Sequence, residues 1–144
     1  MKFKSRKDLS MKIFTIVMCG FLTTILLIRI NVEGYDNLNF IFLDSLILAV
    51  IGFLLWSYFG TEYELTETEL KYKSGPVKGS MKIEKITEII IGGTLWVGVK
   101  PATALNGLIV KVGGFDEIYI SPKTNESFTT EILKLNKNIK ITRK

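Results

Sequence analysis

Hydrophobic residues form two long runs within the first sixty positions of the chain. The second run, residues 40–59, contains one charged residue, Asp44. At about 1.5 Å of rise per residue, a helix of this length covers roughly 30 Å, the hydrocarbon thickness of a bilayer. The first run, residues 13–28, is uncharged and lies between Lys12 and Arg29, whose long side chains can reach the two interfaces. The pattern predicts two transmembrane helices, at about residues 13–30 and 40–59.

A cleaved signal peptide is the alternative interpretation of the first run, because basic residues precede it. Its end, residues 26–31, has no small residues one and three positions before a cleavage point, so we expect both helices to remain in the chain. Five lysines and arginines precede the first helix, whereas the connection at residues 31–39 has none. Because cationic flanks stay on the cytoplasmic side, we expect the N-terminus and everything after Phe59 in the cytoplasm.

Two charged residues, Arg29 and Asp44, lie toward the outer end of this predicted helical hairpin. Their depths differ by roughly 4.5 Å at helical rise, which an arginine side chain can bridge. We expect an intramembrane ion pair that stabilises the hairpin, and an ion or substrate path is the alternative. Small residues four positions apart would also allow the helices to approach closely: Gly20 with Thr24, and Ser45 with Ala49.

From Thr61 onward, apolar and polar residues alternate in short segments separated by turn residues, which is typical of antiparallel strands. The expected strands are residues 62–65, 69–74, 79–83, 88–91, 95–99, 107–112 and 117–120. A helix is expected after Pro122, with Thr124 as its cap. On this helix Phe128, Ile132 and Leu135 fall on one face. Residues 139–141 are expected to form an edge strand or a frayed end.

These patterns together predict an α+β fold in two parts. Residues 1–60 are expected to form a membrane anchor of two transmembrane helices. Residues 61–144 are expected to form a cytoplasmic, mostly antiparallel β barrel or sandwich, closed by the single C-terminal helix.

Composition argues against several kinds of chemistry. The chain has no histidine, and its single cysteine, Cys19, lies in the first predicted helix. The chain therefore lacks the histidine and cysteine residues that a zinc site or a histidine-activated nucleophile requires. The glycine pairs also lack the lysine and the strand-to-helix context of a phosphate-binding loop. We expect no enzyme activity and no cofactor.

The net charge of +5 is partly explained by the basic N-terminal flank, because residues 61–144 hold thirteen basic against ten acidic residues. This mild and dispersed excess argues against a nucleic-acid surface. The nearest approach to a basic patch consists of Lys71, Lys73, Lys78, Lys82 and Lys85. We interpret it as a solvated sheet face, with a surface for anionic lipid or an acidic partner as the alternative. Trp96 is interpreted as core or strand packing rather than as an exposed binding anchor.

The succession of strand and turn motifs resembles the bacterial pleckstrin-homology (PH) domains that follow two membrane helices. The motifs are Tyr63-Glu64-Leu65, Glu69-Leu70-Lys71-Tyr72, Ser74-Gly75-Pro76, Ile83-Glu84-Lys85-Ile86, and Ile120-Ser121-Pro122 ahead of Phe128 and Leu133. The Ile-Ser-Pro piece before the closing helix is the most specific. The resemblance implies a PH-like fold rather than an activity, because these families are generally of unknown function. A related group includes bacteriocin immunity proteins.

Two departures from similar proteins limit what the resemblance implies. Residues 104–107 read Ala-Leu-Asn-Gly where similar proteins often carry a serine, one further residue and an arginine, so any role of that arginine is lost. The loop of Thr66, Glu67 and Thr68 is acidic where lipid-binding PH domains outside bacteria gather basic residues. We therefore expect no specific phosphoinositide recognition, because these carboxylates would repel phosphate.

The sequence thus predicts a non-catalytic interaction module in the inner membrane of a bacterium. It would cross the membrane twice, with both termini and the PH-like domain in the cytoplasm. Its expected partners are the lipid bilayer and a protein or a second copy of the chain. The alternative functions are a bacteriocin immunity protein, and a subunit of a transporter or channel in which Arg29 and Asp44 line a path.

Overall fold

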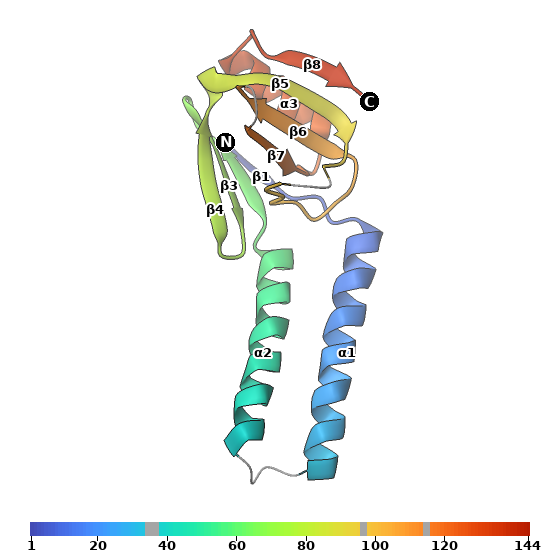
Figure 1. The fold of residues 1–144 in the computed structure, drawn as a ribbon. Helices are drawn as coiled ribbons and strands as arrows, with labels where there is room; N and C mark the ends of the chain where they lie inside the picture. The colour runs from blue at the N-terminus through green and yellow to red at the C-terminus, as the bar shows by residue number, and fades with distance from the viewer. Residues whose placement is uncertain (34–37, 96–97, 114–115) are drawn as a thin grey trace.

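A computed structural model describes residues 1–33, 38–95, 98–113 and 116–144 of the chain. Figure 1 shows two long helices, α1 (Leu9–Glu33) and α2 (Leu38–Phe59), that extend side by side from a β-rich part. Both chain termini lie in that β-rich part. Its other elements are β1 (Lys2–Lys4), β2 (Glu62–Leu65), β3 (Glu69–Ser74), β4 (Val77–Lys82), the 3-10 turn η1 (Ile83–Lys85), β5 (Ile86–Gly93), β6 (Gly107–Val112), β7 (Asp116–Ile120), α3 (Asn125–Leu135) and β8 (Lys140–Arg143).

The β-rich part consists of two four-stranded sheets. One has the order β1-β2-β3-β4 and is antiparallel throughout. The other has the order β7-β6-β5-β8, in which only the β5–β8 pair is parallel. The two sheets and α3 share one apolar core, which includes Tyr63, Leu70, Ile89, Leu108, Ile120, Phe128 and Ile132. This is a sandwich closed by a C-terminal helix, and it confirms the α+β expectation.

The first strand, β1, precedes both long helices in the sequence and yet belongs to the first sheet. Lys2, Phe3 and Lys4 pair with residues 64, 63 and 62 of β2. The Phe3 ring meets the Phe128 ring edge-on at 5.1 Å. The expected division assigned all of residues 1–60 to the anchor, whereas the structure places this strand in the sandwich. Three residues give almost no periodic signal, and their partner strand lies beyond both helices.

The long helices carry most of the exposed apolar surface. Both are long and apolar enough to cross a membrane, over Leu9–Val32 and Ile41–Phe59. The expected close contact through small residues does not occur at Gly20, because a methyl group there would meet nothing within 4 Å. The hydroxyls of Thr24 and Ser45 donate instead to carbonyls one turn earlier in their own helices, at 2.9 and 2.5 Å.

Two further expectations differ from the structure in detail, and one lies outside the described residues. No strand forms in the described part of residues 95–99, where Val99 makes a single bridge to Ile118. Trp96 lies outside the described residues, so its expected role is untested. Thr124 does occupy the position before α3, but its side chain makes no capping hydrogen bond, and that expectation was wrong.

The last strand, β8, is held to the second sheet through Glu88 of β5. The Glu88 carboxylate accepts a hydrogen bond from the Thr142 hydroxyl of β8 at 2.6 Å and another from the Lys111 ammonium of β6 at 3.1 Å. These two hydrogen bonds, the Thr142 bond first, lower the pKa of Glu88 below its ordinary value. The C-terminal segment is therefore an ordered strand.

Gly107 lies where the backbones of two neighbouring strands in the second sheet pass close to each other. A Cβ atom at this position would lie 2.2 Å from the carbonyl oxygen of Ile120 in the neighbouring strand β7. Only glycine fits such an approach. The Gly107 amide also donates a hydrogen bond to the Tyr119 hydroxyl at 2.8 Å.

Candidate functional site

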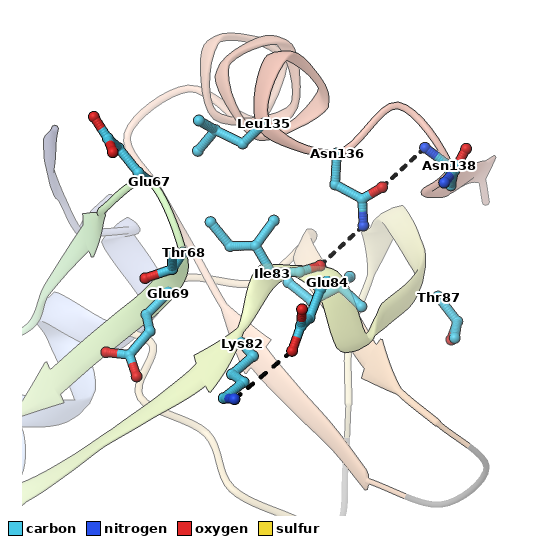
Figure 2. A pocket seen from close by; sticks show the side chains of 11 residues that line it. Glu67, Thr68, Glu69, Lys82, Ile83, Glu84, Thr87, Leu135, Asn136 and Asn138 are labelled. Carbon is cyan, nitrogen blue, oxygen red and sulfur yellow. Dashed lines mark hydrogen bonds and ion pairs between the residues drawn. The ribbon is translucent and has the colours of Figure 1, made fainter.

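A cavity of about 770 Å³, lined by described residues, lies at one edge of the sandwich. Figure 2 shows it between the β2–β3 turn, the end of β4 with η1, and the C-terminal end of α3. Its lining residues are Glu67, Thr68, Glu69, Lys82, Ile83, Glu84, Ile86, Thr87, Leu135, Asn136 and Asn138. We call this cavity the rim groove.

One wall of the rim groove is the β2–β3 turn, which hydrogen bonds keep in shape. The amide of Glu69 donates to the Thr66 hydroxyl at 2.9 Å, and the Thr66 amide donates to the Glu69 carbonyl at 2.9 Å. The Ile83 amide donates to the Thr68 carbonyl, also at 2.9 Å. This last bond ties the turn to η1, so Glu67 projects from a fixed backbone.

The opposite wall is the end of α3. The Asn136 side chain donates from Nδ2 to the Ile83 carbonyl at 3.0 Å, and its Oδ1 accepts from the Asn138 amide at 3.0 Å (Figure 2). Asn136 therefore satisfies a carbonyl of η1 and stabilises the chain that leaves the helix. Sequence reasoning gave this residue no role, because a lone asparagine after a helix carries no specific signal.

The rim groove combines negative charge with an apolar wall. Three carboxylates, those of Glu67, Glu69 and Glu84, line it together with the ammonium of Lys82. Lys82 lies 3.7 Å from Glu84. Leu135 contributes an exposed apolar side chain with 43% of its surface accessible. Such a surface can accept a cationic or mixed apolar and basic segment, and it would repel an anion.

The predicted basic residues gather on the outer face of the first sheet, with one exception. The register places Lys71, Lys73, Lys78 and Lys82 on the same exposed face, and Lys85 lies apart in η1. Sequence reasoning missed two further members, Lys2 and Lys4, which β1 adds to this face. Their alternation around Phe3 was a possible signal. The lysines are interleaved with Glu62, Glu64 and Glu69, which makes the face mixed in charge.

The predicted partners Arg29 and Asp44 meet in the structure. Their side chains form an ion pair between α1 and α2 and are 11% and 18% exposed. This pair lies near the end of the helices away from the sandwich, so it is remote from the rim groove (Figure 1). Each charge therefore has a counter-ion within the helical hairpin, as apolar surroundings favour.

A buried polar cluster joins the sandwich to the chain segment that enters α1. The Tyr63 hydroxyl donates to the Pro101 carbonyl at 2.5 Å and accepts from the Ser121 amide at 3.0 Å. It also lies 3.1 Å from the Ser5 hydroxyl, which in turn accepts from the Thr103 hydroxyl at 2.9 Å. Burial raises the pKa of Tyr63, and the hydrogen bonds to Ser121 and Ser5 oppose that rise. We call these five residues the junction cluster.

The next residues of the same segment continue this attachment. The guanidinium of Arg6 donates to the carbonyls of Leu105 and Asn106, and its Nε lies 3.2 Å from the Asp8 carboxylate. Asp8 accepts from the Leu105 amide at 2.8 Å. The start of α1 is therefore bound to the loop that precedes β6.

The end of α2 is attached as well. The Thr61 hydroxyl bonds the Ser57 carbonyl of α2 at 2.6 Å and lies 2.9 Å from the Ser74 hydroxyl of β3. The backbone also passes close there, because a Cβ at Gly75 would lie 2.8 Å from the Ser57 hydroxyl. Both long helices are thus fixed to the sandwich rather than tethered by free linkers.

A two-sheet sandwich that one C-terminal helix closes, carried on two apolar helices, defines a PH-like domain with a helical hairpin. The family model described as bacterial PH domain matches residues 61–136, and the chain belongs to this family. A similar protein is the uncharacterized protein YyaB of Bacillus subtilis (strain 168), 27% identical over 95 residues. That similarity covers 65% of each chain, slightly less than two thirds of the relative's length. No solved structure matches the chain.

Proposed function

We propose that the chain is a membrane-anchored interaction module. In this proposal α1 and α2 cross the inner membrane of a bacterium and hold the PH domain at its cytoplasmic face, where it binds a protein partner. The proposal assigns no chemical step to the chain, because the sequence has no histidine and its one cysteine lies in α1.

The observation that carries the proposal is the exposed apolar surface of the two helices. Phe42, Phe53 and Trp56 are 75%, 49% and 55% exposed, and many aliphatic neighbours are similarly open. In water, apolar surface of this extent is unfavourable by about 25 cal/mol per Å². A bilayer covers it, and the basic N-terminal flank favours a cytoplasmic position for the sandwich.

The rim groove is the surface that we propose for the partner. Strand β3 connects the two ends of the first sheet, with Ser74 beside α2 and Glu69 in the rim groove. A strand of six residues spans about 20 Å. The rim groove is therefore held away from the bilayer surface, where a protein segment carrying lysine or arginine beside an apolar residue can reach it.

The position relative to the membrane is tested by labelling single cysteines in cells. A Cys19→Ala background receives either Asn31→Cys, near the end of α1, or Ser127→Cys on the exposed surface of α3. A maleimide that does not cross membranes is expected to label position 31 in spheroplasts and position 127 only after lysis. The reverse pattern would refute the orientation, and labelling of neither position before lysis would refute the anchor.

The partner surface is tested by photo-crosslinking in the same cells. A photoreactive amino acid replaces Leu135, which lines the rim groove. As the control, the photoreactive amino acid replaces Thr130, on another face of α3. We expect a discrete protein adduct at position 135 and none at position 130. Equal adducts, or no adduct at position 135, would contradict this surface. A toxin or a transporter subunit in the adduct would favour one of the two alternative functions.

A further inference from the structure

A second cavity, of about 570 Å³, lies between α1 and α2 where they meet the sandwich. Its lining residues are Lys7, Lys12, Thr15, Ile16, Cys19, Leu55, Tyr58 and Phe59. The two lysines are at the end nearest the sandwich, and the aliphatic residues follow along the helices. The Thr15 hydroxyl donates to the Met11 carbonyl at 2.9 Å, so its hydrogen is already used within α1. We call this cavity the helix groove.

Lys7 is held at the mouth of the helix groove by two aromatic rings. Its ammonium lies 4.9 Å from the centre of the Tyr58 ring and 4.3 Å from that of the Phe59 ring. The residues on either side of it, Arg6 and Asp8, both bind Leu105 in the loop that precedes β6. Cation–π contacts position an ammonium while leaving its N–H groups available to an anion on the other side. The Lys7 ammonium is therefore held at the mouth of the helix groove, and its N–H groups can still donate hydrogen bonds.

The charge at this mouth has no counterpart within the groove. Lys12 adds a second ammonium from the first turns of α1, and none of the described residues that line the cavity is acidic. Asp8, the nearest carboxylate in sequence, is occupied by Arg6 at 3.2 Å and by the Leu105 amide at 2.8 Å. Two cations above an apolar floor are complementary to one anionic group that carries a hydrocarbon chain.

We propose that the helix groove binds one anionic phospholipid. Its phosphate lies between the ammonium groups of Lys7 and Lys12, and an acyl chain runs along Ile16, Cys19 and Leu55. A zwitterionic lipid fits the same floor, but its own cation faces the two lysines, and this disfavours it. The inference rests on the proposed membrane anchoring, because only an inserted hairpin brings lipid to this level. It differs from phosphoinositide recognition, since the ligand contacts the helices rather than the acidic β2–β3 turn.

The test uses the full chain in vesicles of equal amounts of phosphatidylcholine and phosphatidylglycerol. After mild detergent extraction, mass spectrometry measures the phospholipid that remains bound. We expect phosphatidylglycerol to be enriched roughly fivefold or more, the effect of about one well-placed cation near a membrane surface. The double variant K7Q/K12Q is expected to return to the vesicle ratio. The matched control K71Q/K73Q removes two charges from the sheet face and is expected to keep the enrichment.

A third variant separates the apolar floor from the charges. Ile16→Trp fills the helix groove while both lysines remain, and we expect it to reduce bound phosphatidylglycerol as well. The proposal is overturned if the wild-type chain shows no enrichment, if K7Q/K12Q keeps it, or if Ile16→Trp leaves it unchanged. Flotation with the vesicles in a density gradient is measured for every variant. A wild-type chain that does not float refutes the anchor itself, whereas a chain that floats without enrichment refutes only the lipid site.

Discussion

Tyr63→Phe removes a single oxygen atom from the junction cluster. The Tyr63 side chain is 1% exposed, and its hydroxyl contacts the Pro101 carbonyl, the Ser121 amide and the Ser5 hydroxyl. Phenylalanine keeps the ring and its packing in the core. The change therefore isolates the hydrogen bonds of the Tyr63 hydroxyl, one of which reaches Ser5 in the segment before α1.

The expected loss of stability follows from the buried groups that lose their hydrogen-bond partner. A buried donor or acceptor that loses its partner costs about 1–3 kcal/mol. Here one amide and one carbonyl are affected, but the Ser5 and Ser121 hydroxyls still contact each other at 2.9 Å and can shift to compensate in part. We expect the free energy of unfolding of the sandwich to fall by about 2 kcal/mol.

The same residue predicts a dependence on pH. Burial raises the pKa of Tyr63 above its ordinary value of 10.0, so the folded state favours the neutral hydroxyl. This contribution is fully present below pH 10.0 and is lost as the pH rises through that value toward the higher folded pKa. The Tyr63→Phe variant is expected to lack this alkaline loss of stability.

The assay is denaturant unfolding of the full chain in detergent micelles, followed by circular dichroism and by hydrogen exchange in β2 and β7. Tyr72→Phe is the matched control. Tyr72 lies on the adjacent strand β3, and its hydroxyl makes no hydrogen bond to a described residue. If Tyr63→Phe destabilises the sandwich no more than Tyr72→Phe does, the reasoning about the junction cluster is wrong.

Three further predictions concern other parts of the chain. Asp44→Asn, measured by thermal unfolding in nanodiscs, is expected to destabilise the helical hairpin by about 3 kcal/mol because Arg29 loses its ionic partner; unchanged stability would contradict this. Glu88, whose pKa is lowered, stabilises β8 above its ordinary pKa of 4.5 and loses that effect as the pH falls below 4.5 through the folded pKa. The protection factors of the β8 amides against hydrogen exchange, which remove the intrinsic effect of pH on exchange, should therefore fall in acid, and Glu88→Gln should abolish this dependence. Gly107→Ala should cost about 3 kcal/mol or more, since the added methyl meets backbone, whereas Gly20→Ala should be nearly neutral in the same unfolding assay.

The local sequence pattern was sufficient to predict a helix or strand wherever its apolar residues recur with a clear period. The strands at residues 69–74 and 107–112 were predicted with their observed bounds, because alternation and flanking turn residues are both strong there. The closing helix began where expected. Its cap did not follow the rule, since Thr124 precedes the helix without bonding to it. Cap positions are local, but the side-chain rotamer depends on tertiary surroundings.

Features that depend on contacts far apart in sequence were not predictable in the same way. Strand β1 pairs with β2, which follows both helices in the sequence. From sequence alone, its lysines were therefore interpreted as the basic flank of the first helix. The junction cluster gathers Ser5, Tyr63 and Ser121 from three distant segments. Sequence reasoning quoted Tyr63 and Ser121 within motifs, yet nothing local indicated that they meet. The rim groove likewise forms only when the β2–β3 turn and the end of α3 come together.

The pairing of β1 with β2 has a consequence for the order of events during synthesis. Residues 5–61, including both long helices, separate these neighbouring strands. The first strand to leave the ribosome must therefore wait for the chain to reach Leu65 before its pairing is complete. Closing so long a loop carries an entropic cost that shrinks once the two helices lie side by side. We therefore expect the first sheet to be completed after the two helices have associated, and a chain whose helices fail to associate to expose the edge of β2.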